Sequence, residues 1–286
     1  MVKFKVSVII PVYNAKEFLR NSVESAQKLV EVGEIILVED GSPDNALELC
    51  GKLENEFSKV RCLCHPEGKN LGAGASRNLG ILNAKFSFIS FLDADDWYLP
   101  NRFKTEKELF ANPEVDGVYG STGYYVEGSG LKDDLKTTFN NKVHANDVLY
   151  NLVSYKGHFH TNAITIRKSL FEKTEKFNTD LRLHQDTHLW YKLAHFGNLE
   201  SGQISKNIAV RREHSENRIH YKNKNSRKKL HQAVFSDFKN YKNVDKRAMR
   251  IIINRFVHSK NSNIYYKLAI YCKLFFQNPS LIKMII

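Results

Sequence analysis

The stretch "VSVIIP" at residues 6–11 is an almost unbroken apolar run, and it decides the fold class. A strand with one face in water alternates apolar and polar residues, whereas a strand covered on both faces is apolar throughout. The run therefore predicts a buried strand of a parallel sheet. Apolar side chains at helical spacing follow over residues 17–29, which gives the strand–helix order of an α/β protein.

Three more strands follow within the first hundred residues. We expect them at residues 34–38, 60–64 and 86–92, each separated from the next by a helical stretch. This order predicts an α/β fold whose central sheet is mostly parallel and flanked by helices. Hydrophobic residues make up 42% of the chain, which excludes an intrinsically disordered protein.

The second half of the chain continues with weaker signals. The Gly-rich and charged residues 127–134 predict a loop, residues 163–168 a strand and residues 186–197 a helix. From about residue 215 the sequence becomes basic and mostly helical in pattern.

The strand at residues 86–92 ends in three carboxylates, Asp93, Asp95 and Asp96. Carboxylates at this spacing repel one another and need a counter-charge. Mg²⁺ and Mn²⁺ suit one or two carboxylates completed by phosphate oxygens and water. The Asp-Ala-Asp triplet therefore predicts a site for a metal ion and a diphosphate. The alternative is a solvated turn in which Asp96 caps the following segment.

Other strand ends also carry polar residues. Tyr13 follows the first strand and can stack on a base, and Asp40 follows the second and can accept the imide hydrogen of uracil. Arg77 begins a helix beside the glycine-bearing residues 70–81, where cationic and N–H donors can face a diphosphate. Ligands of open α/β sheets bind beyond the carboxyl ends of the strands, so we interpret these residues as one nucleotide site. Packing of Tyr13, a turn role for Asp40 and an ion pair of Arg77 are the alternatives.

Five stretches of this sequence resemble the inverting nucleotide-sugar glycosyltransferases of family 2, which have the Rossmann-like GT-A fold. Four lie on the nucleotide side: "VSVIIPVYNA" (6–15), "VEDGSPDN" (38–45), "NLGAGASRNLGI" (70–81) and "FLDADDWYLPN" (91–101). The fifth, "LHQDTHLWYKL" at residues 183–193, resembles the acceptor-side helix of the family. The similarity covers roughly residues 4–200.

The resemblance implies a role for each matching residue. The implied donor-binding residues are Pro11, Val12, Tyr13, Asp40, Gly41, Arg77, Asp93, Ala94 and Asp95. An Mn²⁺ or Mg²⁺ ion is implied at Asp93 and Asp95, with His214 as a third ligand or a diphosphate contact. Asp186 matches the catalytic base of the family.

Gln185 and Trp190 are the implied acceptor contacts. Helical spacing also allows Trp190 to be a core residue, and Asp186 can cap the helix that follows it. Two positions depart from the family pattern. Glu39 stands where the family often has Asp, next to the implied uridine contact. Gln185 stands where the family usually has Glu, which removes a like charge beside Asp186; a difference in acceptor recognition is the other interpretation.

The resemblance implies transfer of a hexose or N-acetylhexosamine from a UDP-sugar to a hydroxyl of a glycan. The implied reaction is a metal-dependent single displacement that inverts the anomeric centre. The expected acceptor is a lipid-linked, lipopolysaccharide or capsule oligosaccharide. An inactive nucleotide-sugar-binding module is one alternative. A nucleic-acid-binding protein is another, suggested by charge alone; no recognised motif supports it, and we predict no nucleic-acid partner.

The formal net charge of +12 is concentrated at the C-terminal end. Residues 206–286 hold 19 Lys and Arg against 4 Asp and Glu. We predict a GT-A catalytic domain at 1–214, with a nucleotide-sugar half at 1–100 and an acceptor half at 101–214, and a basic helical region at 215–286. Basic helices with apolar faces can lie on an anionic membrane surface, and packing on the catalytic domain is the alternative.

The cysteines indicate a reducing compartment. Cys50, Cys62, Cys64 and Cys272 lack the spacing of a disulfide framework, and the sequence shows neither a secretory signal nor an uncharged apolar run of membrane-spanning length. We expect a cytoplasmic protein that the basic region attaches to the cytoplasmic face of the inner membrane. A metal site could be considered at Cys62, Cys64 and His65. The two cysteines alternate as one face of a strand would, however, so we predict that they pack in the core.

Overall fold

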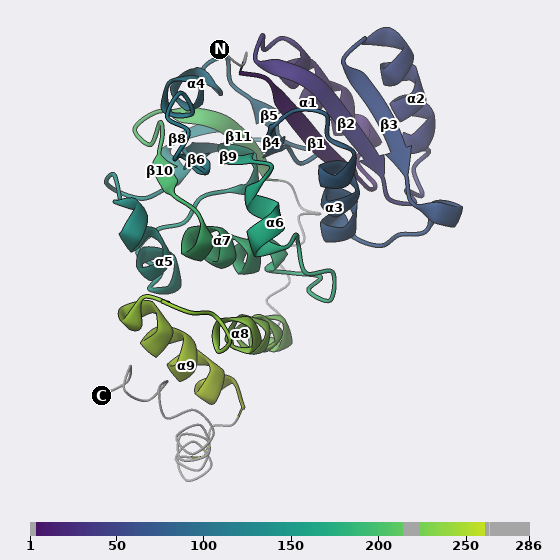
Figure 1. Ribbon diagram of the computed structural model, residues 1–286. Helices are drawn as coiled ribbons and strands as arrows, with labels where there is room; N and C mark the ends of the chain where they lie inside the picture. Colours follow the sequence, from purple (N-terminus) through teal and green to yellow (C-terminus); the bar gives the residue numbers. More distant parts are fainter. Residues whose placement is uncertain (1–3, 214–223, 261–262, 264–286) are drawn as a thin grey trace.

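The computed structural model describes residues 4–213, 224–260 and 263, and it contains the predicted parallel sheet (Figure 1). Seven strands lie in the order β10-β6-β9-β4-β1-β2-β3. In that order their bounds are Leu199–Ser201, Gly117–Tyr119, Ile164–Arg167, Phe88–Phe91, Val6–Val12, Val32–Glu39 and Val60–Cys64. Neighbouring strands are parallel except at β9, which runs antiparallel to both β4 and β6. The α/β class with a mostly parallel sheet is confirmed.

Both faces of the sheet are covered, as the apolar run of the first strand predicts. Along β1, Ile9 joins one apolar cluster, whereas Val8 and Ile10 join the other. The cluster of Val8 and Ile10 lies under α1 (Lys16–Gln27), α2 (Ala46–Glu56) and the flanks of α4 (Lys104–Leu109). The cluster of Ile9 lies under α3 (Ala73–Asn83), α5 (Ala145–Val153), α6 (Leu170–Thr174) and α7 (Gln185–Phe196).

A second, four-stranded sheet has the order β5-β11-β7-β8. Its strands are Trp97–Tyr98, Asn207–Glu213, Ser121–Val126 and Gly130–Thr137. Since β5 follows the acidic cluster directly, its pairing with β11 brings the end of β11 beside that cluster.

The prediction of a loop at residues 127–134 is wrong for most of that range, because β8 begins at Gly130. β7 and β8 form a hairpin in which Val126 pairs with Gly130, so only a short turn separates the strands. Gly128 and Gly130 have φ of +78° and +76°, a backbone conformation that glycine adopts at little cost. The glycines mark the turn, whereas the second strand is set by pairing with β7, which the composition of the segment does not reveal.

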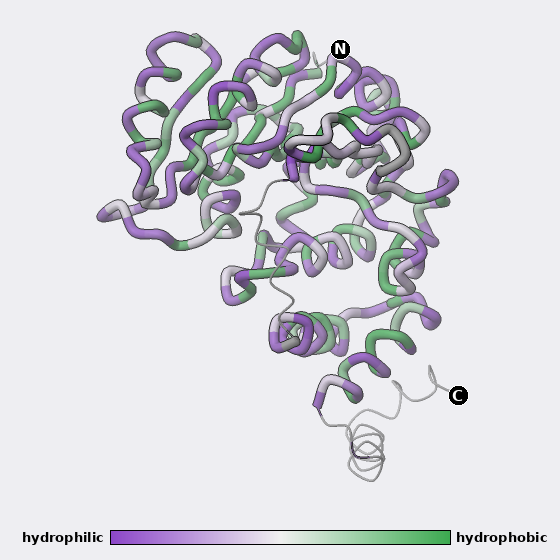
Figure 2. The backbone as a smooth tube through the Cα atoms, turned by 180° about the vertical axis from the view of Figure 1, so that it is seen from behind, coloured by the Kyte–Doolittle hydropathy of each residue, from purple (hydrophilic) through white to green (hydrophobic). Residues whose placement is uncertain are grey.

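The C-terminal basic region contains two helices, α8 (Lys224–Phe238) and α9 (Lys246–Lys260), which alternate hydrophilic and hydrophobic stretches (Figure 2). Their apolar side chains join the cluster of Ile9, α5 and α7. These include Leu230, Val234, Phe235, Phe238, Met249, Ile252, Ile253 and Val257. These two helices therefore pack on the predicted catalytic domain, which was the alternative to attachment on a membrane surface.

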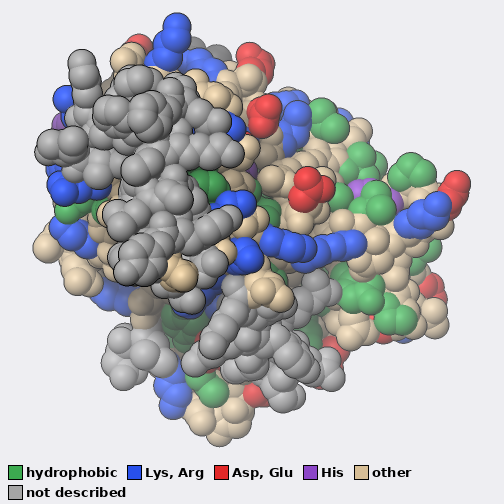
Figure 3. Space-filling model, turned by 90° about the horizontal axis from the view of Figure 1, so that it is seen from below, with side chains coloured by type: hydrophobic (Ala, Val, Ile, Leu, Met, Phe, Trp, Pro, Cys, Tyr) green, Lys and Arg blue, Asp and Glu red, His purple; other side chains and the backbone are tan. Residues whose placement is uncertain are grey.

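Lys and Arg side chains gather on the face of the molecule where α8 and α9 lie (Figure 3). Lys228 and Lys229 of α8 are exposed. No helix in the described part of the chain is both long and apolar enough to cross a bilayer.

Candidate active site

The polar residues predicted at the strand ends lie along one edge of the sheet. Tyr13 follows β1, Asp40 follows β2 and Asp93 lies just beyond β4, and these three strands are parallel neighbours. The backbone ties the ends together, because Asp40 N donates to Val12 O (2.9 Å) and Leu92 N donates to Ile9 O (3.0 Å). The structure thus brings the predicted nucleotide residues to one place.

Residues around the ends of β1 and β2 shape this edge. Pro11 and Val12 are the last residues of β1, and Tyr13 is 38% exposed. Gly41 lies in the turn after β2 and donates to Glu39 Oε2 (3.1 Å). Glu39 is buried and also accepts from Ser42 N, so its carboxylate serves this turn.

Asp40 holds the glycine-bearing loop before α3, a role that sequence reasoning missed. Its Oδ1 accepts from Leu71 N (2.7 Å) and its Oδ2 accepts from Gly72 N (2.9 Å). Gly72 itself has φ of +92°, which glycine tolerates and other residues rarely adopt. The sequence held part of the signal, a loop with several backbone N–H donors that need acceptors, but the burial of Asp40 beside this loop depends on the tertiary structure.

His65 extends the same network. Its Nε2 lies 3.0 Å from Ser76 Oγ and 3.5 Å from Asp40 Oδ1, and the side chain is buried. No cluster of three His, Cys, Asp or Glu able to hold a metal occurs in the described ranges, so Cys62, Cys64 and His65 do not form one. The role of His65 is to fix Asp40 and the first turns of α3.

Arg77 forms a buried ion pair with the acidic cluster. Its Nη2 donates to Asp93 Oδ1 at 2.6 Å, and its side chain is 7% exposed. The guanidinium also lies 5.4 Å from the ring centre of Phe177. Burial, the largest single influence, acts to raise the pKa of Asp93, but the charge and hydrogen bond of Arg77 together with smaller contributions from neighbouring residues such as Arg211 outweigh it, and the pKa lies below its ordinary value. The ion-pair alternative for Arg77 therefore describes the structure, with a buried partner.

Asp96 is a structural member of the cluster. It is 1% exposed and accepts from Asn162 Nδ2 (2.8 Å) and Arg212 N (3.1 Å). Burial, reinforced by the charges of Asp95 and Asp93, raises its pKa well above the ordinary value. Asp96 therefore anchors the turn between β4 and β5, whereas Asp93 is only partly buried, with 30% of its side chain exposed.

Arg212, from β11, fixes the backbone of the Asp-Ala-Asp turn. Its Nε donates to Asp95 O (3.3 Å), and its guanidinium lies 4.8–5.4 Å from the ring centres of Phe18, Trp97 and Tyr125. Ala94 is buried, and Ser22 Oγ donates to Ala94 O (2.7 Å). Nothing in the spacing of the sequence singles out Arg212, because only strand pairing brings β11 to this turn.

The helix predicted at residues 186–197 is α7, which begins one residue earlier at Gln185. Asp186 lies in its first turn, and its Oδ1 accepts from Thr187 N (2.7 Å). The N-cap residue is His184, with φ of +62°, so the capping alternative for Asp186 is not what the structure shows. The Asp186 carboxylate is held by its own helix.

Gln185 brings the acceptor-side helix against the donor loop. It lines a narrow crevice with Gly72 and Gly74, and its Oε1 occupies the place where a Cβ at Gly74 would stand. A second link joins Arg182 Nη1 to Asn70 Oδ1 (3.4 Å). The N-terminus of α7 therefore lies beside the start of α3.

The acceptor assignment of Trp190 is corrected. Its side chain is fully buried and packs against Phe159 and Phe177, at ring-centre distances of 5.4 and 6.2 Å. Trp190 lies one helical turn after Asp186, in the part of α7 that belongs to the apolar core. A core role, which helical spacing also allowed, is the correct one, and an acceptor sugar does not reach this ring.

Two histidines near these carboxylates were missed by sequence reasoning. His158 and His160 precede the short helix η2 (Thr161–Ala163). Burial lowers the pKa of His160 to about 4, with Asp93 opposing it, and burial lowers the pKa of His158, with Asp186 opposing it. Both rings are therefore neutral near pH 7 and lie within electrostatic range of the two carboxylates. The sequence feature that could have identified these two residues is their His-x-His spacing at 158–160.

The donor set at Asp93 and Asp95 fits a metal ion that is shared with a substrate. Since the described residues offer no complete metal cluster of their own, phosphate oxygens and water would have to complete the coordination. Asp93 is held ionised beside Arg77, as a metal ligand must be. His214, the third predicted ligand, lies outside the described residues.

The fold is that of an α/β protein with polar residues at the ends of parallel strands, and comparison with known proteins gives its family. The chain belongs to glycosyl transferase family 2, whose model matches residues 7–174. The crystal structure of S. aureus TarS 1–349 in complex with UDP-GlcNAc is similar with a TM-score of 0.70 at 18% identity, covering 89% of this chain and 72% of that one. This likeness confirms the GT-A fold.

Curated relatives match parts of the chain. Glycosyltransferase GlyG of Streptococcus pneumoniae serotype 4 is 36% identical over 126 residues, which are 44% of this chain and 41% of GlyG. The minor teichoic acid biosynthesis protein GgaA of Bacillus subtilis strain 168 is 28% identical over 194 residues, which are 65% of this chain and 42% of GgaA. The matched region thus spans about two fifths of the length of these relatives.

Proposed function

We propose that this protein is an inverting, metal-dependent glycosyltransferase that moves a hexose or N-acetylhexosamine from a UDP-sugar to a glycan hydroxyl. One observation carries the proposal. Helix α3, whose Arg77 pairs with Asp93, contacts Gln185 at the start of α7, and His160 lies within electrostatic range of both Asp93 and Asp186. These links support a candidate base and a candidate diphosphate site on neighbouring elements.

The donor half of the proposal uses Tyr13 and Asp40. The exposed ring of Tyr13 would stack on the base. Each carboxylate oxygen of Asp40 has lone pairs beyond those used by the loop, so Asp40 can still accept from uracil. The TarS structure in complex with UDP-GlcNAc, which has the same fold, supports a UDP-sugar as the donor.

Asp93 and Asp95 would hold an Mn²⁺ or Mg²⁺ ion together with the diphosphate. When bound, such an ion neutralises charge on the diphosphate leaving group. Arg77 keeps Asp93 ionised and fixes one of its oxygens, and Arg212 fixes the backbone beside Asp95. These contacts orient the two carboxylates before any ligand arrives.

Asp186 would act as the base. Its Oδ1 accepts from Thr187 N, which leaves Oδ2 to accept the proton of the acceptor hydroxyl. The acceptor oxygen then forms a bond to the anomeric carbon as the bond to the diphosphate oxygen breaks on the opposite face. This single displacement inverts the anomeric centre.

The acceptor is proposed to be a cell-surface glycan, either lipid-linked or of the lipopolysaccharide or capsule kind. The similarity to a protein named for minor teichoic acid biosynthesis supports a surface polymer. The basic face of α8 and α9 would attach the enzyme to anionic head groups on the cytoplasmic side of the membrane (Figure 3).

Measurement of UDP release from UDP-Glc, UDP-Gal, UDP-GlcNAc and UDP-GalNAc with Mn²⁺ tests the catalytic proposal. We expect turnover with one of these donors and loss of turnover in Asp95→Asn. Binding of a UDP-sugar without turnover, in the presence of a range of glycan acceptors, would favour the inactive module. Salt-dependent binding of an oligonucleotide would favour the nucleic-acid alternative.

Binding to anionic liposomes at low salt tests the membrane proposal. Deleting the region would uncover the core, because α8 and α9 pack against it, so the better variant is Lys228→Gln/Lys229→Gln. We expect this variant to bind less well than the wild type. Equally poor binding by both proteins would show that the basic face has another role.

A further inference from the structure

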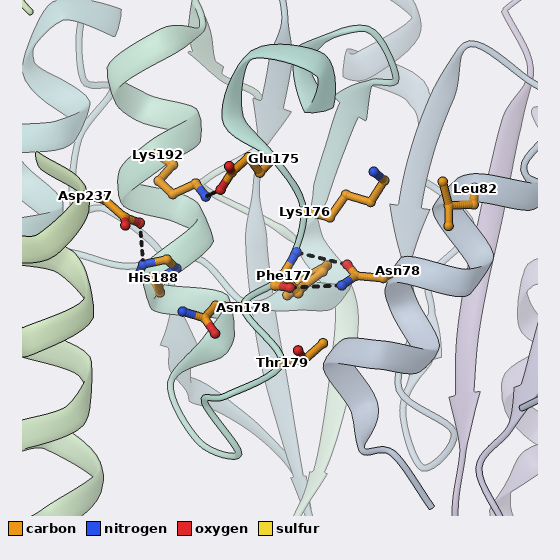
Figure 4. A pocket seen from close by; sticks show the side chains of 10 residues that line it. All are labelled: Asn78, Leu82, Glu175, Lys176, Phe177, Asn178, Thr179, His188, Lys192 and Asp237. Atoms are coloured by element: carbon orange, nitrogen blue, oxygen red, sulfur yellow. Dashed lines mark hydrogen bonds and ion pairs between the residues drawn. The ribbon is translucent and has the colours of Figure 1, made fainter. Parts of the chain in front are cut away.

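A cavity of about 460 Å³ lies apart from the candidate active site, between α3, the loop at residues 175–179, α7 and α8 (Figure 4). Its lining is polar and charged apart from Leu82 and Phe177. The volume is within the range of small-molecule sites. Polar side chains around a cavity need hydrogen-bond partners, so this lining is suited to water or to a polar ligand.

Lys192 of α7 is a buried ammonium group with spare donors. It is 2% exposed, and its Nζ lies 3.1 Å from Glu175 Oε2. Within the described residues Glu175 is its only hydrogen-bond partner, and the Glu175 side chain is 85% exposed, so water screens the pair. An ammonium group has three N–H donors, and burying it is costly unless they are satisfied. A ligand in the cavity would satisfy the others.

His188 lies one turn earlier on the same face of α7 and is also incompletely paired. Its Nε2 is 2.9 Å from Asp237 Oδ2, yet neither ring nitrogen makes a well-directed hydrogen bond to any described residue. The His188 side chain is 1% exposed and that of Asp237 is 31% exposed. Figure 4 shows this pair at one side of the cavity and the Lys192–Glu175 pair at another.

The charges of the lining indicate the class of ligand. Lys176 and Lys192 balance Glu175 and Asp237, so the cavity favours neither an anion nor a cation. It offers both donors and acceptors, and hydroxyl and amide groups, both present in hexoses and N-acetylhexosamines, are neutral groups that donate and accept. The lining therefore suits a polyhydroxylated ring, and Leu82 at the rim, 63% exposed, adds an apolar contact for one face of that ring.

The cavity is linked to the candidate catalytic residues. Thr179 lines both this cavity and the crevice that contains Gln185. Along α7, Asp186 and Lys192 are separated by an axial rise of about 9 Å and by about 120° around the helix, so their side chains leave different faces of α7. We propose that the cavity binds a sugar residue of the acceptor glycan other than the one whose hydroxyl reacts at Asp186. This inference rests on the proposed function.

Saturation-transfer NMR on the full chain, saturated with UDP and Mn²⁺, tests the inference. The probes are the methyl glycosides of glucose, galactose, mannose, N-acetylglucosamine and N-acetylgalactosamine. We expect at least one to bind and Lys192→Met to weaken its binding by about tenfold or more. Lys173→Met, an exposed lysine of α6 outside the cavity, is the matched control and should bind like the wild type.

Glu175→Ala is a second variant that keeps the test valid if Lys192→Met fails to fold. We expect it to fold because the Glu175 side chain is mostly in water. It should also weaken the glycoside. Absence of binding by every glycoside, or equal binding by the wild type and both variants, would overturn the inference. UDP affinity is measured in parallel by calorimetry. Glycoside binding that depends on Lys192 in a protein that binds no UDP would support the cavity assignment and refute the donor assignment alone.

Discussion

Arg77 Nη2 lies 2.6 Å from Asp93 Oδ1, so α3 is joined by a buried ion pair to the acidic turn that ends β4. The same helix is held at its start by Asp40, and its Asn78 hydrogen-bonds both the N–H and the carbonyl of Phe177 at 2.9 Å. Helix α3 thus connects the candidate donor site to the loop at residues 175–179, which lines the cavity proposed to bind the acceptor.

The first prediction concerns this ion pair. Arg77→Met and Asp93→Asn should each lower the free energy of unfolding by about 2 kcal/mol, because the first leaves the partly buried Asp93 and the second the buried Arg77 without a charged partner. The double variant should lose less than the sum. Chemical denaturation of the four proteins measures the coupling. The exposed pair Arg20–Glu56 is the control and should show much weaker coupling; equal coupling in the two pairs would contradict the role of burial.

The second prediction concerns the proposed base. Asp186→Asn should reduce sugar transfer by about 10²–10⁴-fold, because an amide cannot take the proton of the acceptor hydroxyl. UDP affinity should not change, since within the described residues the hydrogen bonds of Asp186 are to Thr187 of its own helix. Initial rates and calorimetry measure the two effects. Asp180→Asn, at an exposed position of the preceding loop, is the matched control. Transfer by Asp186→Asn at the wild-type rate would require a different base.

The third prediction concerns the metal. A chelator should abolish turnover, and Mn²⁺ or Mg²⁺ should restore it, because the two carboxylates at this turn cannot neutralise a diphosphate by themselves. In Asp95→Asn the activity should not return at any Mn²⁺ concentration. Full turnover by the wild type in the presence of chelator would show that Asp93 and Asp95 have another task.

The fourth prediction compares two glycines in helices. A methyl group at Gly80 of α3 would overlap the Ile9 side chain of β1, so Gly80→Ala should destabilise the protein by about 1–3 kcal/mol. Gly51 of α2 has open space around it, and Gly51→Ala should stabilise the protein by about 0.5–1 kcal/mol. Thermal unfolding measures both. A stable Gly80→Ala variant would mean that α3 can move away from the sheet.

The fifth prediction concerns pH and His231 of α8. Burial, helped by the nearby charge of Arg255, lowers its pKa in the folded protein to about 4, below the ordinary 6.5. Between these values the unfolded chain binds the extra proton, so stability falls as the pH is lowered from about 6.5 to 4. His231→Gln should remove on the order of one proton from the pH dependence of unfolding in that window. An unchanged slope would show that His231 ionises freely in the folded protein.

Much of the candidate donor site could be predicted from the sequence, because the ends of the strands are recognisable in it. The apolar run at residues 6–11 is covered on both faces, and the acidic residues after β4 lie beside Asp40 and Tyr13 as expected for parallel neighbours. These features depend on the local order of apolar and polar residues, which periodicity reports directly.

The remaining features depend on partners that are distant in the sequence. Asp40 clamps residues 71 and 72, Arg77 pairs with Asp93, and Arg212 reaches Asp95 from β11. The burial of Trp190 has the same origin, since the rings of Phe159 and Phe177 cover it.

The sequence by itself determined the class of fold, the edge of the sheet where a nucleotide would bind, and the acids that would face it, because each is written in contiguous residues. Only the tertiary structure decided which charges are paired, which aromatic ring is core, that α8 and α9 pack on α7 and α5, and that Lys192 and His188 line a cavity. The physical reason is that burial and pairing depend on side chains brought together from separate elements, and the spacing along a single chain does not record that proximity.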